Sequence, residues 1–352
     1  MVSVVLSVHD DEPFLGECLE SVLAQIGVSF EVIAIDDGST DGSAALLDLY
    51  AERDARLRVV HQPNAGLTRA LIRACAMARG RFVARQDADD IAFPGRLARL
   101  AAELDAHPEV VLVASAAVMV GPRGELLSPR DATGKGRDTS CHGTWMFRRD
   151  VYKQVGGYRP HFRAAQDEDL RLRFATRGEV RVLPDVLYAS RIREGSISAV
   201  SPIQKRLSRL AHEAAARRAR GLDDADILAE AARLSAERGA RPRVEPGAGD
   251  YFAGRCLVAL GDRRAVNYLW RACRREPARV GRWLALGQAL VATRSSRGFD
   301  VAATGIAPRA GNAGNAAADD AIPRAVQRPG PPLLGGRGHR VADQPRADGA
   351  RP

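Results

Sequence analysis

The feature that most constrains the fold is an alternation of short β-branched runs with helical patterns over residues 1–201. This alternation is typical of an α/β domain, in which helices cover a mainly parallel sheet. The runs predict strands at residues 2–8, 31–35, 57–60, 81–85, 110–113, 144–148 and 180–188. Apolar residues at helical spacing predict the first helix at residues 13–24.

Residues 202–293 and 294–352 differ from this domain and from each other. The first segment has a helical pattern throughout, is rich in Ala and Arg, and indicates two or three packed helices. The second holds 16 Gly and Pro in 59 residues, with Phe299 as its only aromatic residue. Such a segment cannot bury enough apolar surface to offset its ordering entropy. We therefore expect a small all-α region followed by a disordered tail.

Cysteine usage and charge indicate where such a chain works. Five scattered cysteines without a C-x-x-C pair are expected to be reduced thiols in a cytoplasmic protein. The N-terminus reads as a strand and not as a signal peptide, and no stretch reaches the ~18 apolar residues of a membrane span. Nine Arg against five Asp place +4 of the net charge of +9 in the tail, so we expect no nucleic-acid partner. Peripheral attachment to the inner face of a membrane stays open.

An apolar strand that ends in three carboxylates is the strongest chemical signal. In the stretch GRFVARQDADDIAFPGR, residues 80–96, the strand runs directly into Asp87, Asp89 and Asp90. Carboxylates crowded in this way repel one another unless a cation is present. A D-x-D pair can present oxygens to Mg²⁺ or Mn²⁺ while the metal takes the phosphates of a nucleotide. The alternative is a solvated acidic turn.

A second acidic cluster favours the metal interpretation. Asp36 and Asp37 also follow an apolar strand, within the stretch IDDGSTDGS. Ligands of open α/β sheets lie outside the carboxyl ends of the strands, so two acidic strand ends in one domain indicate a shared site. No G-x-G-x-x-G follows the first strand, which argues against a dinucleotide oxidoreductase.

A third acidic group begins a helix predicted at residues 166–175. Asp167, Glu168 and Asp169 lie in its first turn, where the helix dipole favours any carboxylate. A general base must approach the group whose proton it removes to ~2.6 to 3.2 Å. The residues alone do not select one of the three acids for that role.

Five stretches, in this order, resemble the family 2 glycosyltransferases, which are enzymes of the GT-A fold: VSVVLSVHDDE, FEVIAIDDGSTDGS, NAGLTRALIRACAMARGRFVARQDADDIAFPGR, CHGTWMFRRDVYKQVGGY and AAQDEDLRLRFATRG. The resemblance covers about residues 2–198. It implies a GT-A type nucleotide-diphospho-sugar transferase domain at residues 1–201, ahead of the helical C-terminal region at 202–293 and the tail at 294–352. It also implies dependence on Mn²⁺ or Mg²⁺.

The resemblance implies roles for residues of the first four strands. Ser7 and His9 match positions near the nucleotide base, with His9 standing where a tyrosine is usual. Asp37 matches the residue that hydrogen-bonds the base. Asp87 and Asp89 match the D-x-D pair, which contacts the ribose and holds the metal.

The remaining assignments fall later in the chain. Asp167 matches the catalytic base, and Gln166 replaces the acid that usually precedes it, which removes a neighbouring like charge. Arg69 and Arg96 match basic positions near the donor, although Arg96 would also serve to tie its loop onto the acids.

Four further side chains are candidates for acceptor or phosphate contacts. Ser190-Arg191-Ile192-Arg193 replaces the usual Y-R-x-H, so Arg191 and Arg193 become candidates for contacts with phosphate. His142 is a candidate acceptor contact, with a structural role as the alternative. Trp145 would stack on a sugar or anchor the core.

These residues together predict an inverting hexosyltransferase that moves a sugar from a nucleotide-diphosphate donor, by default UDP, to an acceptor hydroxyl. We expect a glycan or lipid-linked acceptor and a role in cell-surface polysaccharide or glycoconjugate synthesis; the oligomeric state is left open. One alternative is a catalytically weak nucleotide-sugar-binding scaffold. A nucleotidyltransferase would need a Gly-rich basic loop near the N-terminus, where residues 9–12 are instead HDDE.

Overall fold

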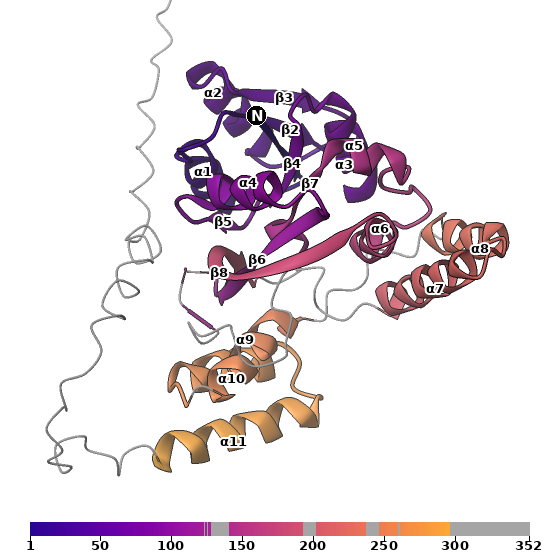
Figure 1. Ribbon diagram of the computed structural model, residues 1–352. Coiled ribbons are helices and arrows are strands. Elements are labelled where there is room, and N and C mark those ends of the chain that lie inside the picture. Colours follow the sequence, from indigo (N-terminus) through magenta and orange to yellow (C-terminus); the bar gives the residue numbers. More distant parts are fainter. Residues whose placement is uncertain are drawn as a thin grey trace, which may run out of the picture.

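A computed structural model describes residues 1–122, 124, 126, 127, 141–192, 202–236, 246–259 and 261–295. Its centre is one mixed sheet in the order β3-β2-β1-β4-β7-β6-β8-β5 (Figure 1). The strands are β1 (Val2–Val8), β2 (Phe30–Asp36), β3 (Leu57–His61), β4 (Phe82–Asp87), β5 (Ile91–Ala92), β6 (Val110–Val120), β7 (Met146–Arg148) and β8 (Glu179–Arg191).

The first half of the sheet is parallel and the second half is mixed. β1 pairs in parallel with β2 and β4, and β2 pairs in parallel with β3. β7 runs antiparallel to both β4 and β6, while β6 and β8 are parallel. The first four strands therefore end at one edge, and the turn from β4 to β5 lies there as well.

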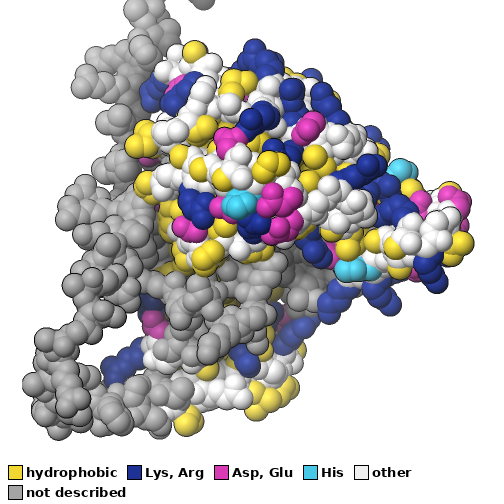
Figure 2. All heavy atoms as spheres, in the orientation of Figure 1, with side chains coloured by type: hydrophobic (Ala, Val, Ile, Leu, Met, Phe, Trp, Pro, Cys, Tyr) yellow, Lys and Arg dark blue, Asp and Glu magenta, His cyan; other side chains and the backbone are white. Residues whose placement is uncertain are grey.

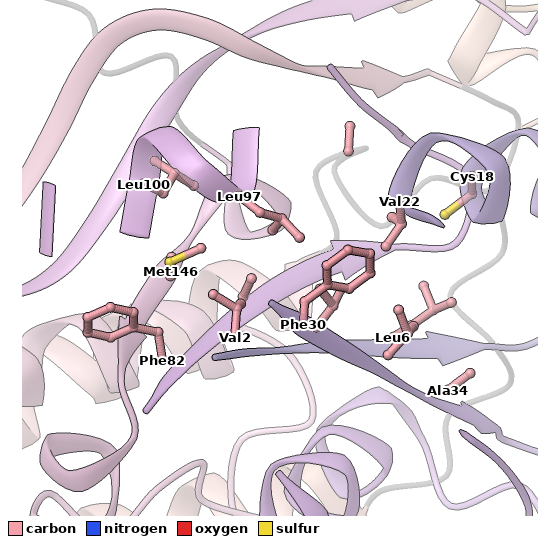
Figure 3. Packing of buried hydrophobic residues seen from close by; sticks show 14 of the residues in the cluster. Val2, Leu6, Cys18, Val22, Phe30, Ala34, Phe82, Leu97, Leu100 and Met146 are labelled. Carbon is pink, nitrogen blue, oxygen red and sulfur yellow. The ribbon is translucent and has the colours of Figure 1, made fainter. Parts of the chain in front are cut away.

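Helices cover both faces of this sheet. The helices of the α/β domain are α1 (Glu12–Leu23), α2 (Ser43–Arg53), α3 (Leu67–Met77), α4 (Arg96–Ala106), α5 (Arg149–Gln154) and α6 (Gln166–Phe174), with a short 3₁₀ helix, η1 (His142–Thr144). In β1, the even-numbered residues from Val2 to Val8 pack on one face with α1 and α4, while Val5 packs on the other face with α3. Figure 3 shows the first of these two cores. Burial on both faces explains why β1 and β6 are almost continuously apolar.

Five helices follow the domain within the residues that the structure describes. They are α7 (Pro202–Ala219), α8 (Ala225–Ala236), α9 (Ala248–Ala259), α10 (Arg264–Arg275) and α11 (Val280–Ser295). Figure 1 shows α7 and α8 beside α6, whereas α9 to α11 form a separate group below β6 and β8. None of the helices in the described ranges has the length and apolar character needed to cross a bilayer. The tail expected to be disordered lies outside the described residues apart from its first two residues, which end α11.

The predicted fold class is confirmed, with differences in detail. All seven predicted strands are present, but β6 and β8 extend to Val120 and Arg191, well beyond the predicted ends. The two-residue strand β5 was not predicted, because a strand this short carries no periodicity and exists only through its pairing with β8.

Candidate active site

The carboxyl ends of the parallel strands bring the first predicted residues together. In the register of the sheet Ser7 lies beside Asp87 of β4 and beside Ile35 of β2. Asp37 follows β2 directly, and its backbone nitrogen donates to the carbonyl of Val8. Ser7, Asp37 and Asp87 therefore share one edge of the sheet.

Asp37 organises the loop that follows β3. Its buried carboxylate accepts hydrogen bonds from Gln62 Nε2 at 2.7 Å and from the backbone nitrogens of Ala65 and Gly66 at 2.8 and 2.7 Å. Asn64 of the same loop contacts the ring of His9 at 3.2 Å. Asp37 and His9 are thus neighbours on one surface, and the exposed Arg69 lies in the first turn of the next helix, α3.

The D-x-D loop concentrates negative charge. Burial raises the pKa of Asp90 well above its ordinary value, and the charges of Asp87 and Asp89 raise it further. Asp90 accepts hydrogen bonds from the Arg191 backbone nitrogen at 2.7 Å and from the Tyr188 hydroxyl. Asp90 therefore anchors the loop to β8, whereas Asp87 and Asp89 remain partly exposed.

These carboxylates fit a divalent cation. Hard oxygen ligands suit Mg²⁺ and Mn²⁺, and such ions are commonly held by one or two carboxylates together with substrate phosphates. Within the described ranges, no group of three His, Cys, Asp or Glu side chains forms a complete metal cage. Asp87 and Asp89 would therefore supply part of the coordination, and a nucleotide diphosphate the rest.

Two fully buried arginines support this acidic edge from inside the sheet. Arg85 forms an ion pair of 2.5 Å with Asp87. Arg96 donates to the carbonyls of Arg85 and Gly143 at 2.7 and 2.6 Å, so it links η1 to β4 through backbone carbonyls and not through the acids. The role of Arg85 was missed by sequence reasoning. Its signal was a charged residue in the middle of an otherwise apolar strand.

Arg191 also holds the acidic loop. Its Nε donates to the carbonyl of Asp89 at 2.9 Å, and Nη2 forms an ion pair of 2.6 Å with Glu17 of α1. The side chain is 4% exposed. The guanidinium is therefore engaged within the protein, which gives it a positioning role rather than the expected phosphate contact. Arg193 lies outside the described residues.

Asp167, in the first turn of α6, lies within electrostatic range of Asp87. Burial raises its pKa, and the charge of Asp87 adds to the increase, so the two carboxylates are close enough to interact. The neighbouring acids are engaged elsewhere. Glu168 pairs with Arg171 and His212, each at 2.8 Å, while buried Asp169 pairs with Arg173 at 2.6 Å. These ion pairs within α6, together with the pair between Glu168 and His212 of α7, distinguish three acids that the sequence left equivalent.

His142 and Trp145 belong to the segment around η1, whose Gly143 lies close to Asp87. His142 Nε2 is 2.6 Å from the Tyr158 hydroxyl, and its ring meets Trp145 edge-on at 5.0 Å. Burial lowers the pKa of His142 well below its usual value, and the nearby charge of Arg85 lowers it further, which keeps the ring neutral. Trp145 is buried in the core. This packing favours the anchoring role for Trp145 over sugar stacking.

Gly143 is a site residue that sequence reasoning did not single out. A Cβ at this position would lie 2.2 Å from the Tyr188 hydroxyl oxygen and 2.9 Å from Asp87 Oδ2. Only glycine therefore allows η1 to approach the acidic loop this closely. Its place between two candidate residues in CHGTW was the only signal.

The helical hairpin of α7 and α8 packs against the segment that precedes Asp167. Phe162 and Ala165 share a core with Leu207 of α7 and Leu234 of α8. The Ser235 hydroxyl donates to the carbonyl of His161 at 2.6 Å. The C-terminal helices therefore fix the position of the candidate base, although they supply no group that reaches the acids of the sheet edge in the described structure.

This fold and this edge of acids define a nucleotide-sugar glycosyltransferase of the GT-A fold, and the comparisons agree. The family described as Glycosyl transferase family 2 matches residues 3–156. The putative glycosyltransferase EpsE of Bacillus subtilis is 34% identical over 188 residues, which cover 50% of this chain and 67% of that protein. The amylovoran biosynthesis glycosyltransferase AmsE of Erwinia amylovora is 31% identical over 208 residues, which cover 56% of this chain and 77% of that protein.

The chain therefore belongs to glycosyltransferase family 2. The match to other relatives is shorter. The chain spans only 30% of the length of the uncharacterized glycosyltransferase EpsJ of Bacillus subtilis. Among solved structures, S. aureus TarS 1-349 in complex with UDP-GlcNAc has a TM-score of 0.51 and 19% identity, covering 84% of this chain and 91% of that one. At this identity the likeness concerns the fold.

The hairpin leads to a testable prediction about catalysis. Leu207→Ala removes a fully buried side chain, at a cost of about 3 kcal/mol of local packing. Because Phe162 and Ala165 lose their support, we expect the kcat of donor hydrolysis to fall about tenfold while the Kd for the donor stays constant. Leu222→Ala, at a side chain that is 53% exposed, is the matched control. Equal kcat values in the two variants would show that the hairpin does not position the base.

Proposed function

We propose that this glycosyltransferase transfers a sugar with inversion from a UDP-sugar donor to an acceptor hydroxyl, assisted by Mn²⁺ or Mg²⁺. We further propose a glycan or lipid-linked acceptor in cell-surface polysaccharide synthesis at the inner face of the membrane. The names of two relatives support this second part, because AmsE is an amylovoran biosynthesis enzyme and RfbC of Myxococcus xanthus an O-antigen biosynthesis protein.

The observation that carries the proposal is the convergence of Asp87 and Asp167. They lie 80 positions apart in the chain, at the end of β4 and in the first turn of α6, yet their charges interact in the folded protein. Ser7 and Asp37 complete the same edge. A site with acids on two sides suits a reaction in which one group leaves and another attacks.

The leaving group is a nucleoside diphosphate, whose negative charge grows as the bond to the sugar breaks. A divalent cation held by Asp89 and Asp87 would neutralise this charge when bound. Arg85 and Arg191 keep the two carboxylates and their loop in place through the ion pair with Asp87 and the hydrogen bond to the carbonyl of Asp89. The loop is thus organised before the donor arrives.

Asp167 is the proposed general base. Its burial favours the protonated form, so the carboxylate is a stronger base than an exposed aspartate and accepts the proton of the acceptor hydroxyl more readily. One displacement from the face opposite the diphosphate inverts the anomeric centre. A retaining mechanism would call for a nucleophile and a covalent intermediate, whereas this proposal needs a single carboxylate base.

The base assignment predicts different effects for two neighbouring acids. Asp167→Asn should lower kcat by about a thousandfold because the proton acceptor is lost, while donor binding persists. Glu168→Gln should stay within about threefold of the parent, since Glu168 pairs with Arg171 and His212. Initial rates of transfer and titration of the donor measure both quantities. A large loss in Glu168→Gln with an active Asp167→Asn would move the base to Glu168.

The pH dependence of the reaction follows from the raised pKa of Asp167. The carboxylate must be ionised to act, so kcat/KM should fall as the pH drops through this pKa, at a higher pH than an ordinary aspartate would give. Gln166→Glu adds a like charge beside Asp167, which should move the acidic limb to still higher pH. A profile that is unchanged in Gln166→Glu would contradict the assignment.

The donor is tested by calorimetric titration of UDP, GDP, CDP and dTDP with and without Mn²⁺. We expect UDP to bind most tightly and only with the metal, because Asp87 and Asp89 repel a diphosphate on their own. Asp89→Ala should abolish the metal-dependent binding, and Asp226→Ala, which removes a 67% exposed carboxylate of α8, controls for a general loss of negative charge. Tighter binding of another nucleotide would make that nucleotide, in place of UDP, the one carried by the donor. Absence of binding to all four would reject the proposed transfer mechanism.

The same experiments distinguish the alternative of a nucleotide-sugar-binding scaffold. A scaffold would bind a nucleotide diphosphate with metal but would show no turnover that depends on Asp167. The engagement of Glu168 and Asp169 in other ion pairs, which leaves Asp167 beside Asp87, favours the active enzyme.

A further inference from the structure

The last two helices carry an exposed apolar surface. Of the twelve large hydrophobic side chains that are exposed in the described residues, six lie on α10 and α11. We call these six the α10–α11 face: Trp270, Val280, Trp283, Leu284, Leu290 and Val291. Leu284 and Val291 are 64% and 67% exposed, so these side chains point largely into solvent and are not part of the hydrophobic core.

The spacing on α11 makes this face a continuous stripe. The apolar residues recur at 280, 283, 284, 290 and 291, which lie on one side of a helix, and Gly287 continues that side. The opposite side, with Ala285, Leu286 and Ala289, is buried against α9 and α10. Rings of Trp270 and Trp283 meet edge-on at 5.9 Å and join α10 to the stripe. In Figure 1, α11 is the outermost helix of its group.

The surroundings of this face are strongly basic. Residues 261–295 contain eight Arg and no Lys, against one Asp and one Glu, which gives a net charge of +6. Arg274 is one helical turn from Trp270, and Arg263 is two turns away on the same side of α10. Both are exposed, and neither makes an ion pair with another described residue. Figure 2 shows hydrophobic and basic side chains together along the lower edge of the molecule, where Figure 1 places these helices.

We propose that the α10–α11 face binds the surface of an anionic lipid bilayer. Tryptophans and aliphatic side chains at helical spacing insert into the boundary between headgroups and acyl chains, and arginines beside them bind anionic headgroups. α11 lies along the interface and does not cross it, in keeping with the absence of a spanning helix among the described residues. A second copy of the chain fits this face less well, because a dimer would bring together two segments of charge +6.

The face is connected to the active-site edge through the core beneath it. α9 to α11 share a hydrophobic cluster with Ile192, which follows β8. The preceding residue, Arg191, donates to the carbonyl of Asp89. Binding to a bilayer would therefore hold the acidic edge at a defined place relative to the membrane. This inference concerns attachment and stands independently of the donor and base assignments.

Co-sedimentation of the full chain with vesicles tests the proposal. We expect binding to vesicles that contain phosphatidylglycerol and much weaker binding to phosphatidylcholine alone. Leu284→Ser combined with Val291→Ser should weaken binding more than about tenfold. Arg263→Gln and Arg274→Gln should each weaken binding to the anionic vesicles by roughly fivefold and leave the neutral vesicles unaffected.

Ile26→Ser and Leu222→Ser are the matched controls, because both replace an exposed hydrophobic side chain outside the face and should bind as the parent does. Brominated lipids should quench Trp270 and Trp283 but not buried Trp145, which shows insertion directly. Circular dichroism establishes that each variant is folded. Equal binding by the face variant and the controls, or a dimer that the face variant dissociates without any vesicle binding, would overturn the proposal.

Discussion

The candidate active site depends on how the crowding of carboxylates at one edge of the sheet is compensated. Parallel strands end side by side, so the acids that follow β2 and β4 are brought together by the geometry of the sheet. This repulsion is partly offset by the buried guanidiniums of Arg85 and Arg191 and partly by protonation, which burial favours at Asp90. What remains is a partly exposed pair, Asp87 and Asp89, that a cation would stabilise.

The supporting residues explain why this edge is rigid. Arg96 bonds the carbonyls of two chain segments beneath the loop, and Gly143 allows η1 to pack within a few ångströms of Asp87. Removing a partner from such a buried network leaves charged or polar atoms without compensation, so each member depends on the others. The acidic edge is therefore held in a defined geometry by the protein itself.

The C-terminal helices serve two separate parts of the molecule. The hairpin of α7 and α8 packs on Phe162 and Ala165 and so supports the helix of Asp167. The group formed by α9 to α11 packs instead on Ile192 at the end of β8 and turns an apolar, basic face outward. One region that the sequence indicated only as helical thus supports the helix of Asp167, our proposed base, on one side and, in our proposal, attaches the enzyme to a membrane on the other.

The sequence by itself determined the fold class and seven of the eight strands of the sheet, because alternating periodicities and turn residues are local properties that need no knowledge of the fold. It also identified the three acidic groups through their positions after strands and at a helix start. The pairs of Glu168 with Arg171 and of Asp169 with Arg173 are also local, because they join residues three and four positions apart within α6. Tertiary structure alone brought Asp167 into electrostatic range of Asp87. It likewise decided that Arg191 holds the acidic loop, since ion pairing and burial depend on neighbours that are distant in the chain.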